Sequence, residues 1–356
     1  MTTRAQVAVA PPHSETVEIH DIELRDPQPY EVLVRILTTG VCHSQLSMMA
    51  APDRGALLLG HEASAVVVET GSRVSHVRAG DEVLITWLPR SVDDRQPGGV
   101  ELAVPGLGAA STHNTFTWAT HALVDERYVV PTPDGVSADV GSVLGCAVIT
   151  GAGAVVNTAD VLAGETVSVW GLGGVGLCAV AAARESGARI IVAVDVAEEK
   201  LALARRFGAT HVVDSRVDDP VAVIRSLTEG EFGEAGVDHA IDCVALTQTL
   251  SGALASVRPG VRGVRQGGDL TIVGIPHGEL TLDPMEFVGR EKQMFGSLGG
   301  SSLPERDIPR FAEWHLSGRM HLDALISDRF ALRDANVAVQ ALRAGEIRGR
   351  AVLEIE

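Results

Sequence analysis

One stretch of the sequence, residues 166–195, constrains the fold of this chain more than any other. A short β-branched run over 166–170 leads directly into the glycine pattern GLGGVG at 171–176. An alanine-rich segment follows and stops at Gly187, and a second apolar run ends at Asp195. This order predicts a strand, a tight turn, a helix, a second strand and an acidic residue at its end.

Each glycine of the pattern has a physical role in a dinucleotide site. Gly171 allows the tight turn off the strand, Gly173 lets backbone N–H groups approach a pyrophosphate, and Gly176 lets the helix pack closely on the sheet. The start of the helix, at Gly174 and Val175, presents unpaired N–H donors and the positive end of the helix dipole. The pattern therefore predicts a dinucleotide-binding βαβ unit.

The acidic residue selects between the two nicotinamide cofactors. The carboxylate of Asp195 can accept hydrogen bonds from both hydroxyls of an adenosine ribose, but it would repel a 2′-phosphate. The next residues, Val196 and Ala197, offer no arginine to receive such a phosphate. The sequence therefore predicts NAD rather than NADP. The alternative is an ordinary βαβ turn in which Asp195 caps the following helix.

Composition argues against several classes of partner. The 356 residues suggest about two domains, and a net charge of −17 without a basic cluster argues against nucleic acid. The N-terminal region lacks the apolar run of a signal peptide, and the longest apolar stretch is broken by glycines. We therefore expect a cytoplasmic protein without a membrane span. The cysteines form no CxxC pair, so we expect reduced thiols at Cys42, Cys146, Cys178 and Cys243.

The pattern of predicted strands and helices changes along the chain. Residues 1–147 read as β-rich, whereas from about 152 to 298 strands alternate with helices, as is typical of a doubly wound parallel sheet. The tail is expected to return with two helices and a closing strand at 350–355. Residues 88–115 and 261–268 read as irregular loops. Six strands are expected in the alternating part, at 166–170, 190–194, 211–213, 237–243, 270–274 and 294–296.

Three residues of the β-rich half form a set suited to a metal ion. Cys42, His61 and Cys146 supply a thiolate, an imidazole and a second thiolate, donors that can hold a catalytic zinc and leave its fourth position open. Taken singly, a cysteine is more often a core residue and a histidine a satisfied polar group. Cys178 and Cys243 keep that simpler interpretation.

The motifs together carry a family resemblance. GVCHS at 40–44, GHE at 60–62, GDEV at 80–83, GC at 145–146, the glycine pattern and Asp195 follow in this order. In this the chain resembles the zinc-dependent alcohol dehydrogenases of the medium-chain dehydrogenase/reductase superfamily. The resemblance implies an α/β protein with a cleft between two domains, assembled as a homodimer or homotetramer. Its domains would be a GroES-like, β-rich catalytic domain (1–147 and 299–356) and a Rossmann NAD-binding domain with a doubly wound parallel sheet (148–298).

The resemblance also implies roles for individual residues. Cys42, His61 and Cys146 would hold the zinc, and Glu62 would lie behind the metal as a ligand that exchanges with water. Ser44 would move the hydroxyl proton of the alcohol.

Further residues would contact the substrate or the cofactor. Trp87 and Trp118 align with bulky positions of the substrate pocket, and the alternative for each is an ordinary core tryptophan. His43 and Arg350 would face the pyrophosphate, and Lys200 the adenosine ribose. The remaining cofactor contacts would come from the glycine pattern, Asp195, Val244, Gly274, Ile275, Ser297 and Leu298.

The chain departs from the family pattern at three places. The family's structural-zinc lobe carries four cysteines, whereas residues 88–115 contain none, so we expect one catalytic zinc per chain and no structural zinc. Three residues after the first zinc cysteine, where the family usually has an acid, this chain has Gln45. An uncharged amide raises the basicity of a metal-bound histidine less than a carboxylate does. Ser47 stands at the position where the family often has the histidine that ends the proton relay.

These features favour a zinc-dependent oxidoreductase that transfers hydride between NAD(H) and a primary or aromatic alcohol or aldehyde. Zinc would act on the substrate oxygen as a Lewis acid. One alternative is an NAD(P)H-dependent reductase of an activated C=C or C=N bond, because the altered relay matters less when no alcohol proton must be moved. Another is a non-catalytic NADH-binding protein without a metal, against which the intact Cys42, His61 and Cys146 set argues.

Overall fold

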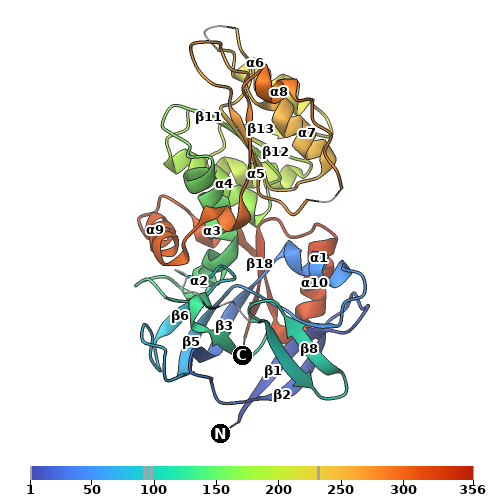
Figure 1. Ribbon diagram of the computed structural model, residues 1–356, viewed down its shortest axis with the longest axis vertical. Helices are drawn as coiled ribbons and strands as arrows, with labels where there is room; N and C mark the ends of the chain where they lie inside the picture. The colour runs from blue at the N-terminus through green and yellow to red at the C-terminus, as the bar shows by residue number, and fades with distance from the viewer. Residues whose placement is uncertain (1, 91–94, 96–98, 231–232, 277, 356) are drawn as a thin grey trace. The chain divides into compact units, whose positions relative to one another are not determined.

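The chain folds into two compact units (Figure 1). The computed structural model describes residues 2–90, 95, 99–230, 233–276 and 278–355. The first unit comprises Met1–Cys146, Leu303–Leu316 and Leu322–Glu356, and the second comprises Ala147–Ser302 and Ser317–His321. The carboxyl-terminal segment thus returns to the unit in which the chain begins.

Strand β3 (Glu31–Val41), rich in Val, Ile and Thr, organises the first unit. It pairs antiparallel with β5 (Ala63–Thr70), β9 (His121–Asp125) and β18 (Arg350–Glu354). Ala351 lies opposite Val41, so this register brings Arg350 beside Cys42. In the described residues the sheet has seven strands and is completed by β6 (Glu82–Ile85), β10 (Val129–Pro131) and β17 (Ile326–Ala331).

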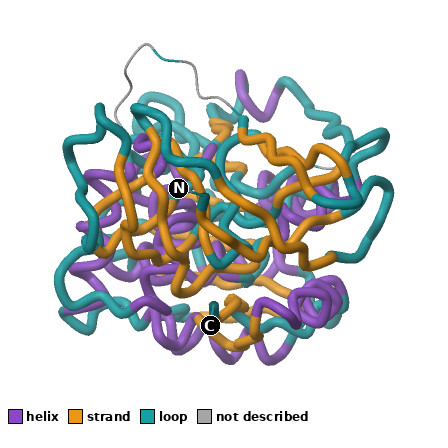
Figure 2. Tube along the Cα trace, turned by 90° about the horizontal axis from the view of Figure 1, so that it is seen from below, coloured by secondary structure: helices purple, strands orange, loops and turns teal. Residues whose placement is uncertain are grey.

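A second sheet of the first unit has five strands within the residues described, in the order β2-β1-β4-β8-β7. Both termini of the chain belong to this strand-rich unit (Figure 2), at the start of β1 and just after β18. The strands of this sheet are β1 (Thr3–Ala10), β2 (Glu18–Leu24), β4 (Ala56–Leu58), β7 (Val100–Val104) and β8 (Gly108–Thr112).

The hairpin of β7 and β8 corrects one prediction. Residues 88–115 were expected to be irregular, but Val100 pairs with Thr112 and Val104 with Gly108 in an antiparallel ladder. The sequence of β8, Gly-Ala-Ala-Ser-Thr, has little intrinsic strand preference, so only its pairing with β7 and β4 makes it a strand. Residues 91–94 and 96–98 of the same stretch lie outside the described part of the chain.

The first unit also contains helices, and two of them begin close to the strands already described. Helix α1 starts directly after Cys42, and α2 starts where the Ser137 hydroxyl accepts a hydrogen bond from the backbone N–H of Val140. The helices are α1 (His43–Ala50), η1 (Glu126–Tyr128), α2 (Ala138–Val143), α9 (Pro304–Leu316), η5 (Leu322–Leu325), η6 (Leu332–Asp334) and α10 (Ala335–Arg343).

One continuous helix, Ala138–Thr158, is long and apolar enough to cross a membrane by length and composition, yet 89% of its most apolar window is buried within the described structure. It therefore has the character of a core helix. Beyond α2 it consists of η2 (Leu144–Val148), α3 (Ile149–Gly153) and η3 (Ala154–Thr158), of which η2 and η3 are π-helical turns. Such turns are frequent at functional sites, and η2 contains Cys146.

The second unit is built on a parallel sheet, which has six strands as far as the chain is described. Its order, β13-β12-β11-β14-β15-β16, and its helices on both faces confirm the expected Rossmann-type doubly wound fold. The strands are β11 (Thr166–Trp170), β12 (Ile190–Asp195), β13 (His211–Asp214), β14 (His239–Asp242), β15 (Asp269–Ile272) and β16 (Gln293–Gly296).

The helices of this unit divide between the two faces of the sheet. Helix α4 packs against α3 and α5, whereas α6 packs against α7. The predicted loop at 261–268 has no helix or strand apart from an isolated bridge between Val261 and Arg265. The helices are α4 (Gly174–Glu185), α5 (Glu198–Phe207), α6 (Pro220–Leu227), α7 (Thr247–Ser256), α8 (Met285–Val288) and η4 (Leu298–Ser301).

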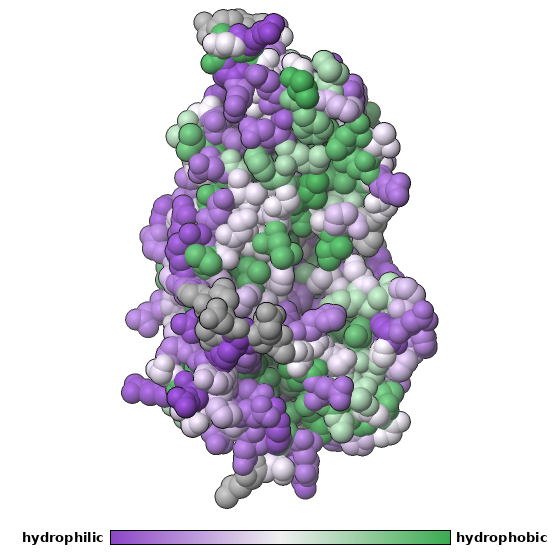
Figure 3. Space-filling view, viewed as in Figure 1, coloured by the Kyte–Doolittle hydropathy of each residue, from purple (hydrophilic) through white to green (hydrophobic). Residues whose placement is uncertain are grey.

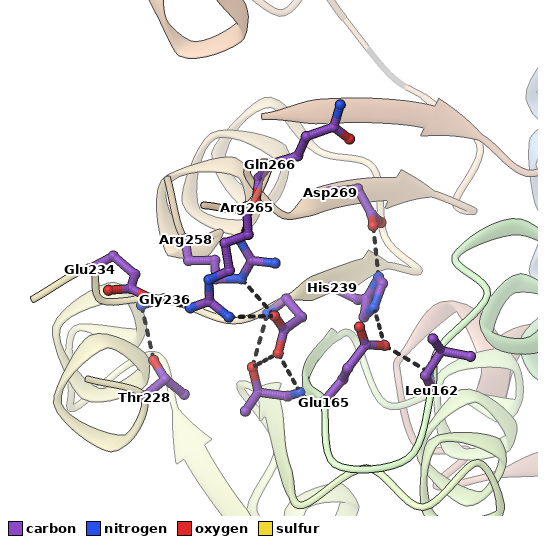
Figure 4. Close-up of polar contacts among 12 residues, drawn as sticks. Leu162, Glu165, Thr228, Glu234, Gly236, His239, Arg258, Arg265, Gln266 and Asp269 are labelled. Atoms are coloured by element: carbon purple, nitrogen blue, oxygen red, sulfur yellow. Dashed lines mark hydrogen bonds and ion pairs between the residues drawn. The ribbon is translucent and has the colours of Figure 1, made fainter. Parts of the chain in front are cut away.

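A buried charged network ties together the amino ends of three neighbouring strands (Figure 4). His239 at the start of β14 lies between two carboxylates, with Nδ1 2.7 Å from Asp269 and Nε2 2.9 Å from Glu165. Although burial lowers it, the hydrogen bonds and negative charges of these two carboxylates raise the pKa of His239 to about 9. The network lies at the opposite end of the sheet from the glycine turn.

Candidate metal and cofactor sites

Three elements of the first unit bring the predicted metal ligands together. Cys42 follows β3 and precedes α1, His61 lies in the loop between β4 and β5, and Cys146 lies in the π-helical turn η2. The ligand atoms of these three residues all lie within 4.8 Å of one another. Nε2 of His61 lies 3.3 Å from Sγ of Cys146. The structure therefore places the three residues as one candidate metal site.

Glycines beside two of the ligands are required by close backbone contacts. Gly60, before His61, has a φ of +89°, a left-handed conformation that glycine adopts without strain. A Cβ at Gly145, before Cys146, would lie 2.3 Å from the backbone oxygen of Ile85. Thr86, the next residue after Ile85, holds Gly145 in place, because its hydroxyl donates a hydrogen bond to the Gly145 carbonyl at 2.7 Å. The GH and GC pairs of the sequence are thus geometric requirements.

The pKa values of the two cysteine thiols are shifted in opposite directions. A hydrogen bond from Cys146, together with the positive charge of Arg350, holds the pKa of the Cys42 thiol well below its usual range. The same hydrogen bond, and then burial, raise the pKa of Cys146 well above its usual range. A thiolate is the form of cysteine that binds metal, so Cys42 is prepared for ligation by its surroundings.

Behind the ligands, Glu62 and Arg350 form a buried ion pair in which Arg350 donates to Oε1 of Glu62. Burial raises the pKa of Glu62. Although burial lowers it, the neighbouring negative charges of Cys42 and Glu62 raise the pKa of Arg350. A Cβ at Gly40 would lie 2.4 Å from Oε1 of Glu62, so the first glycine of GVCHS makes room for this carboxylate.

The pairing of Arg350 with Glu62 was not anticipated from the sequence, which suggested a contact between Arg350 and the pyrophosphate. The contact joins residues 288 positions apart and depends on the register of β18 on β3. The RAVL segment at 350–353 does not by itself indicate this partner. The pyrophosphate contact stays a prediction.

Gln45 is buried in the site and contacts both the His61 ring and the neighbouring backbone. Its Nε2 lies 2.8 Å from Nδ1 of His61, and its Oε1 accepts a hydrogen bond from Gly60 N–H at 2.8 Å. The amide therefore occupies the position that the family pattern gives to an acid.

Ser44 and His43 lie in the first turn of α1, directly after Cys42. The hydroxyl oxygen of Ser44 is buried and has no hydrogen-bond partner among the described residues. A buried polar atom of this kind usually serves a ligand or a reaction. His43 is exposed, and its contact with the cofactor stays a prediction.

The two tryptophans differ in their surroundings. Trp118 is fully buried in a hydrophobic cluster, and its indole N–H donates to the Gly40 carbonyl at 3.1 Å, so it occupies the core position weighed as the alternative. Trp87, after β6, is half-buried. Its indole N–H is buried and meets no acceptor in the part of the chain that the structure describes. Trp87 is therefore the better candidate for a substrate contact.

In the second unit, the glycine pattern forms the turn from β11 into α4. Gly171 has a φ of +85°, and a Cβ there would lie 2.2 Å from Cγ2 of Val244. A Cβ at Gly176 would lie 1.9 Å from the Gly171 oxygen, whereas the space beside Gly173 is open. The turn thus has the close packing and the open approach that a pyrophosphate needs at the start of α4.

Asp195 ends β12 beside this turn. Its carboxylate accepts hydrogen bonds from the backbone N–H groups of Leu172, Val196 and Ala197 at 2.7 to 2.9 Å. A carboxylate has about four acceptor positions, so these bonds fix its orientation and leave capacity for a ligand. Helix α5 begins at Glu198, and its cap is Ala197. Lys200 lies in the first turn of α5.

The other predicted cofactor residues follow the carboxyl ends of neighbouring parallel strands. Ligands of doubly wound sheets bind at this edge. The side chains of Ile275 and Leu298 are exposed, and the Ser297 hydroxyl lies 2.7 Å from that of Thr158. Val244 follows β14, Gly274 and Ile275 follow β15, and Ser297 and Leu298 follow β16.

The residues present fit the two groups that the resemblance implies. A thiolate, an imidazole and a second thiol at mutual ligand distance, with a carboxylate and an arginine behind them, suit a divalent zinc ion. The glycine turn, the start of α4 and the fixed Asp195 suit a dinucleotide. Fold and sites together are those of a dehydrogenase of two compact units with a candidate metal site.

Comparisons with known proteins agree with this class. Residues 28–134 match the family model of the alcohol dehydrogenase GroES-like domain, and residues 174–317 match that of the zinc-binding dehydrogenases. The alcohol dehydrogenase class-3 of Cereibacter sphaeroides is 30% identical, over 97% of this chain and 98% of its own length. The chain therefore belongs to the zinc-containing medium-chain alcohol dehydrogenase family, a family of oxidoreductases.

Solved structures share the fold along the whole chain. An alcohol dehydrogenase zinc-binding domain protein from Burkholderia ambifaria has a TM-score of 0.89 and 30% identity, covering 100% of both chains. The benzyl alcohol dehydrogenase of Acinetobacter calcoaceticus has a TM-score of 0.86 and 27% identity, covering 99% of this chain and 100% of that one. The comparisons confirm the predicted GroES-like and Rossmann fold class.

Proposed function

We propose that this protein is an NAD(H)-dependent zinc alcohol dehydrogenase that interconverts a primary or aromatic alcohol and its aldehyde. The observation that carries the proposal is the convergence of Cys42, His61 and Cys146 within 4.8 Å. Similarity to a benzyl alcohol dehydrogenase supports the aromatic substrate class. The first unit would be the catalytic domain, predicted as 1–147 with 299–356, and the second the NAD-binding domain, predicted as 148–298.

Each residue of the metal site has a separate task. Cys42, His61 and Cys146 would hold the zinc, which would supply Lewis-acid polarisation of the substrate oxygen. The buried hydroxyl of Ser44, which meets no hydrogen-bond partner in the described chain, would take the substrate's hydroxyl proton and pass it on. Glu62 would be the ligand that exchanges with water, and its ion pair with Arg350 would compete with the metal for the carboxylate.

Asp195 would select NAD over NADP. Three backbone donors hold its carboxylate in place, so it cannot easily turn away from a 2′-phosphate. Like charges at a partly desolvated site repel by several kcal/mol, as an order-of-magnitude estimate. Lys200 would contact the same ribose, while the glycine turn, His43 and Arg350 would contact the pyrophosphate.

The protein would carry one zinc per chain and no structural zinc. Of its four cysteines, Cys42 and Cys146 belong to the metal site. Cys178 is buried on α4 and Cys243 follows β14, where burial raises the pKa of Cys243 out of reach of thiolate chemistry. Neither lies in the stretch 88–115.

We further propose a cytoplasmic homodimer or homotetramer without nucleic-acid or membrane partners. Apolar side chains gather over the second unit on the face in Figure 3. Met285, Val288 and Phe295 are among the exposed apolar residues of this unit. Phe295 belongs to β16, which ends the order of the parallel sheet and presents an unpaired edge in the described chain.

The test is to offer a panel of substrates to the zinc-loaded protein and to measure turnover of each one by the consumption of NADH. Aromatic and aliphatic aldehydes are compared with substrates that carry an activated C=C or C=N bond, because the absence of a relay histidine at Ser47 favours those as the second candidate. Turnover of aldehydes supports the proposal. Turnover confined to C=C or C=N substrates establishes the second candidate, and NADH binding without zinc or turnover indicates a non-catalytic protein.

A further inference from the structure

Gln45 faces two groups at once in the metal site. The residue is only 2% exposed. Oε1 accepts from Gly60 N–H at 2.8 Å, and Nε2 lies 2.8 Å from Nδ1 of His61. On the other side of the ring, Nε2 of His61 faces Sγ of Cys146 at 3.3 Å. Nε2 is therefore the ring atom directed toward the other ligands, and Nδ1 is directed toward Gln45.

Metal binding fixes the position of the His61 proton. A neutral imidazole has one N–H and one lone pair. When Nε2 gives its lone pair to a metal, the proton must be on Nδ1, which then becomes a donor directed at Gln45. Gly60 N–H is already a donor directed at the same side chain. Gln45 is thus required to accept two hydrogen bonds at its two ends.

An amide cannot meet this requirement. One end of the Gln45 side chain is an oxygen, which accepts, and the other is an NH₂ group, which only donates. Whichever way the amide is turned, one of the two donors meets another donor. All groups are satisfied only when Oε1 accepts from Gly60, Nε2 donates to Nδ1, and the His61 proton lies on Nε2, where it can donate to the sulfur of Cys146.

We propose that Gln45 is a positioning residue that favours the His61 tautomer unable to bind a metal, and that it thereby weakens the zinc site. Zinc loading must move the ring proton to Nδ1 and leave one buried donor unsatisfied, which is unfavourable. The inference rests on the zinc role proposed for Cys42, His61 and Cys146. With Gln45 at this position, the site would bind zinc less tightly than the same site with a carboxylate there.

The variant Gln45→Glu removes the conflict, because a carboxylate offers one oxygen to each donor. We expect it to tighten zinc binding by about tenfold to a hundredfold, the scale on which hydrogen-bond partners of metal-bound histidines act. The matched control is Met48→Glu. Sδ of Met48 lies 3.8 Å from Nε2 of Gln45, so this variant adds the same charge nearby without a second acceptor for His61 and Gly60. We expect its affinity to stay within about threefold of wild type, because a half-exposed charge acts weakly.

Two measurements on the full-length chain test the proposal. Zinc affinity is measured by competition with a chromophoric chelator in wild type, Gln45→Glu and Met48→Glu. The His61 tautomer is measured by NMR on protein with ¹⁵N-labelled histidines, before and after zinc is added. We expect the proton on Nε2 in metal-free wild type, on Nδ1 in the zinc form, and on Nδ1 in both forms of Gln45→Glu.

Equal zinc affinity of wild type and Gln45→Glu, equal tightening by Met48→Glu, or a proton on Nδ1 in metal-free wild type would each overturn the proposal. The NMR measurement on wild type needs no variant, so it decides the question even if Gln45→Glu does not fold. If none of the three proteins binds zinc, the proposed function itself fails, and the two failures are thereby told apart.

Discussion

Replacement of His239 by glutamine should destabilise the protein in a way that depends on pH. The imidazole lies between Asp269 and Glu165, and its residue is only 8% exposed. Glutamine is neutral at every pH, so it can hydrogen-bond to a carboxylate but carries no positive charge to compensate it. The variant therefore removes the positive charge that compensates two carboxylates, Glu165 just before β11 and Asp269 at the start of β15.

The magnitude follows from the raised pKa. An unfolded histidine has a pKa near 6.5, and that of folded His239 is about 9. A difference of about 2.5 pKa units corresponds to roughly 3 kcal/mol, as an order-of-magnitude figure. Because the folded pKa is raised, this stabilisation is fully present below pH 6.5 and is lost as the pH rises through 9.

The assay is urea unfolding of wild type and His239→Gln at several values between pH 6 and pH 10. The difference in unfolding free energy should be largest at pH 6 and should shrink steadily toward pH 10. His211→Gln is the control, because His211 contacts the Thr210 hydroxyl and no carboxylate in the described chain. A difference between wild type and His239→Gln that stays constant across the pH range would refute the reasoning.

Two further predictions concern the proposed chemistry. Asp195→Ala should reduce the preference for NADH over NADPH, measured as the ratio of kcat/KM values, because it removes the repulsion of a 2′-phosphate; an unchanged ratio would show that Asp195 does not select the cofactor. Ser47→His should speed alcohol oxidation near neutral pH by about tenfold and change aldehyde reduction less, because a neutral imidazole can accept the relayed proton. An unchanged pH profile, with a primary deuterium isotope effect confirming that hydride transfer limits the rate, would place position 47 outside the relay.

Much of the fold could be predicted from local patterns. The glycine turn at 171–176 and the alternation of strands and helices after it are local signals, and they gave the parallel sheet with its six described strands. The hairpin of β7 and β8 could not be predicted, because Ala, Gly and Ser in β8 have little strand preference of their own.

Contacts between distant segments were harder to predict than the elements themselves. The pairing of Arg350 with Glu62 depends on the register of β18 on β3, and the His239 network depends on β14 lying between β11 and β15. The core position of Trp118 depends on a hydrogen bond to Gly40, 78 residues earlier. None of these neighbours is encoded by a local period or motif.

The most direct test of the account is the zinc content of the purified, active protein. Elemental analysis should find one zinc per chain, held by Cys42, His61 and Cys146. Cys42→Ser should lose the zinc and turnover while NADH binding is retained, because the glycine turn and Asp195 lie in the other unit. Two zinc ions per chain, no zinc in active protein, or loss of NADH binding together with turnover in Cys42→Ser would contradict the account.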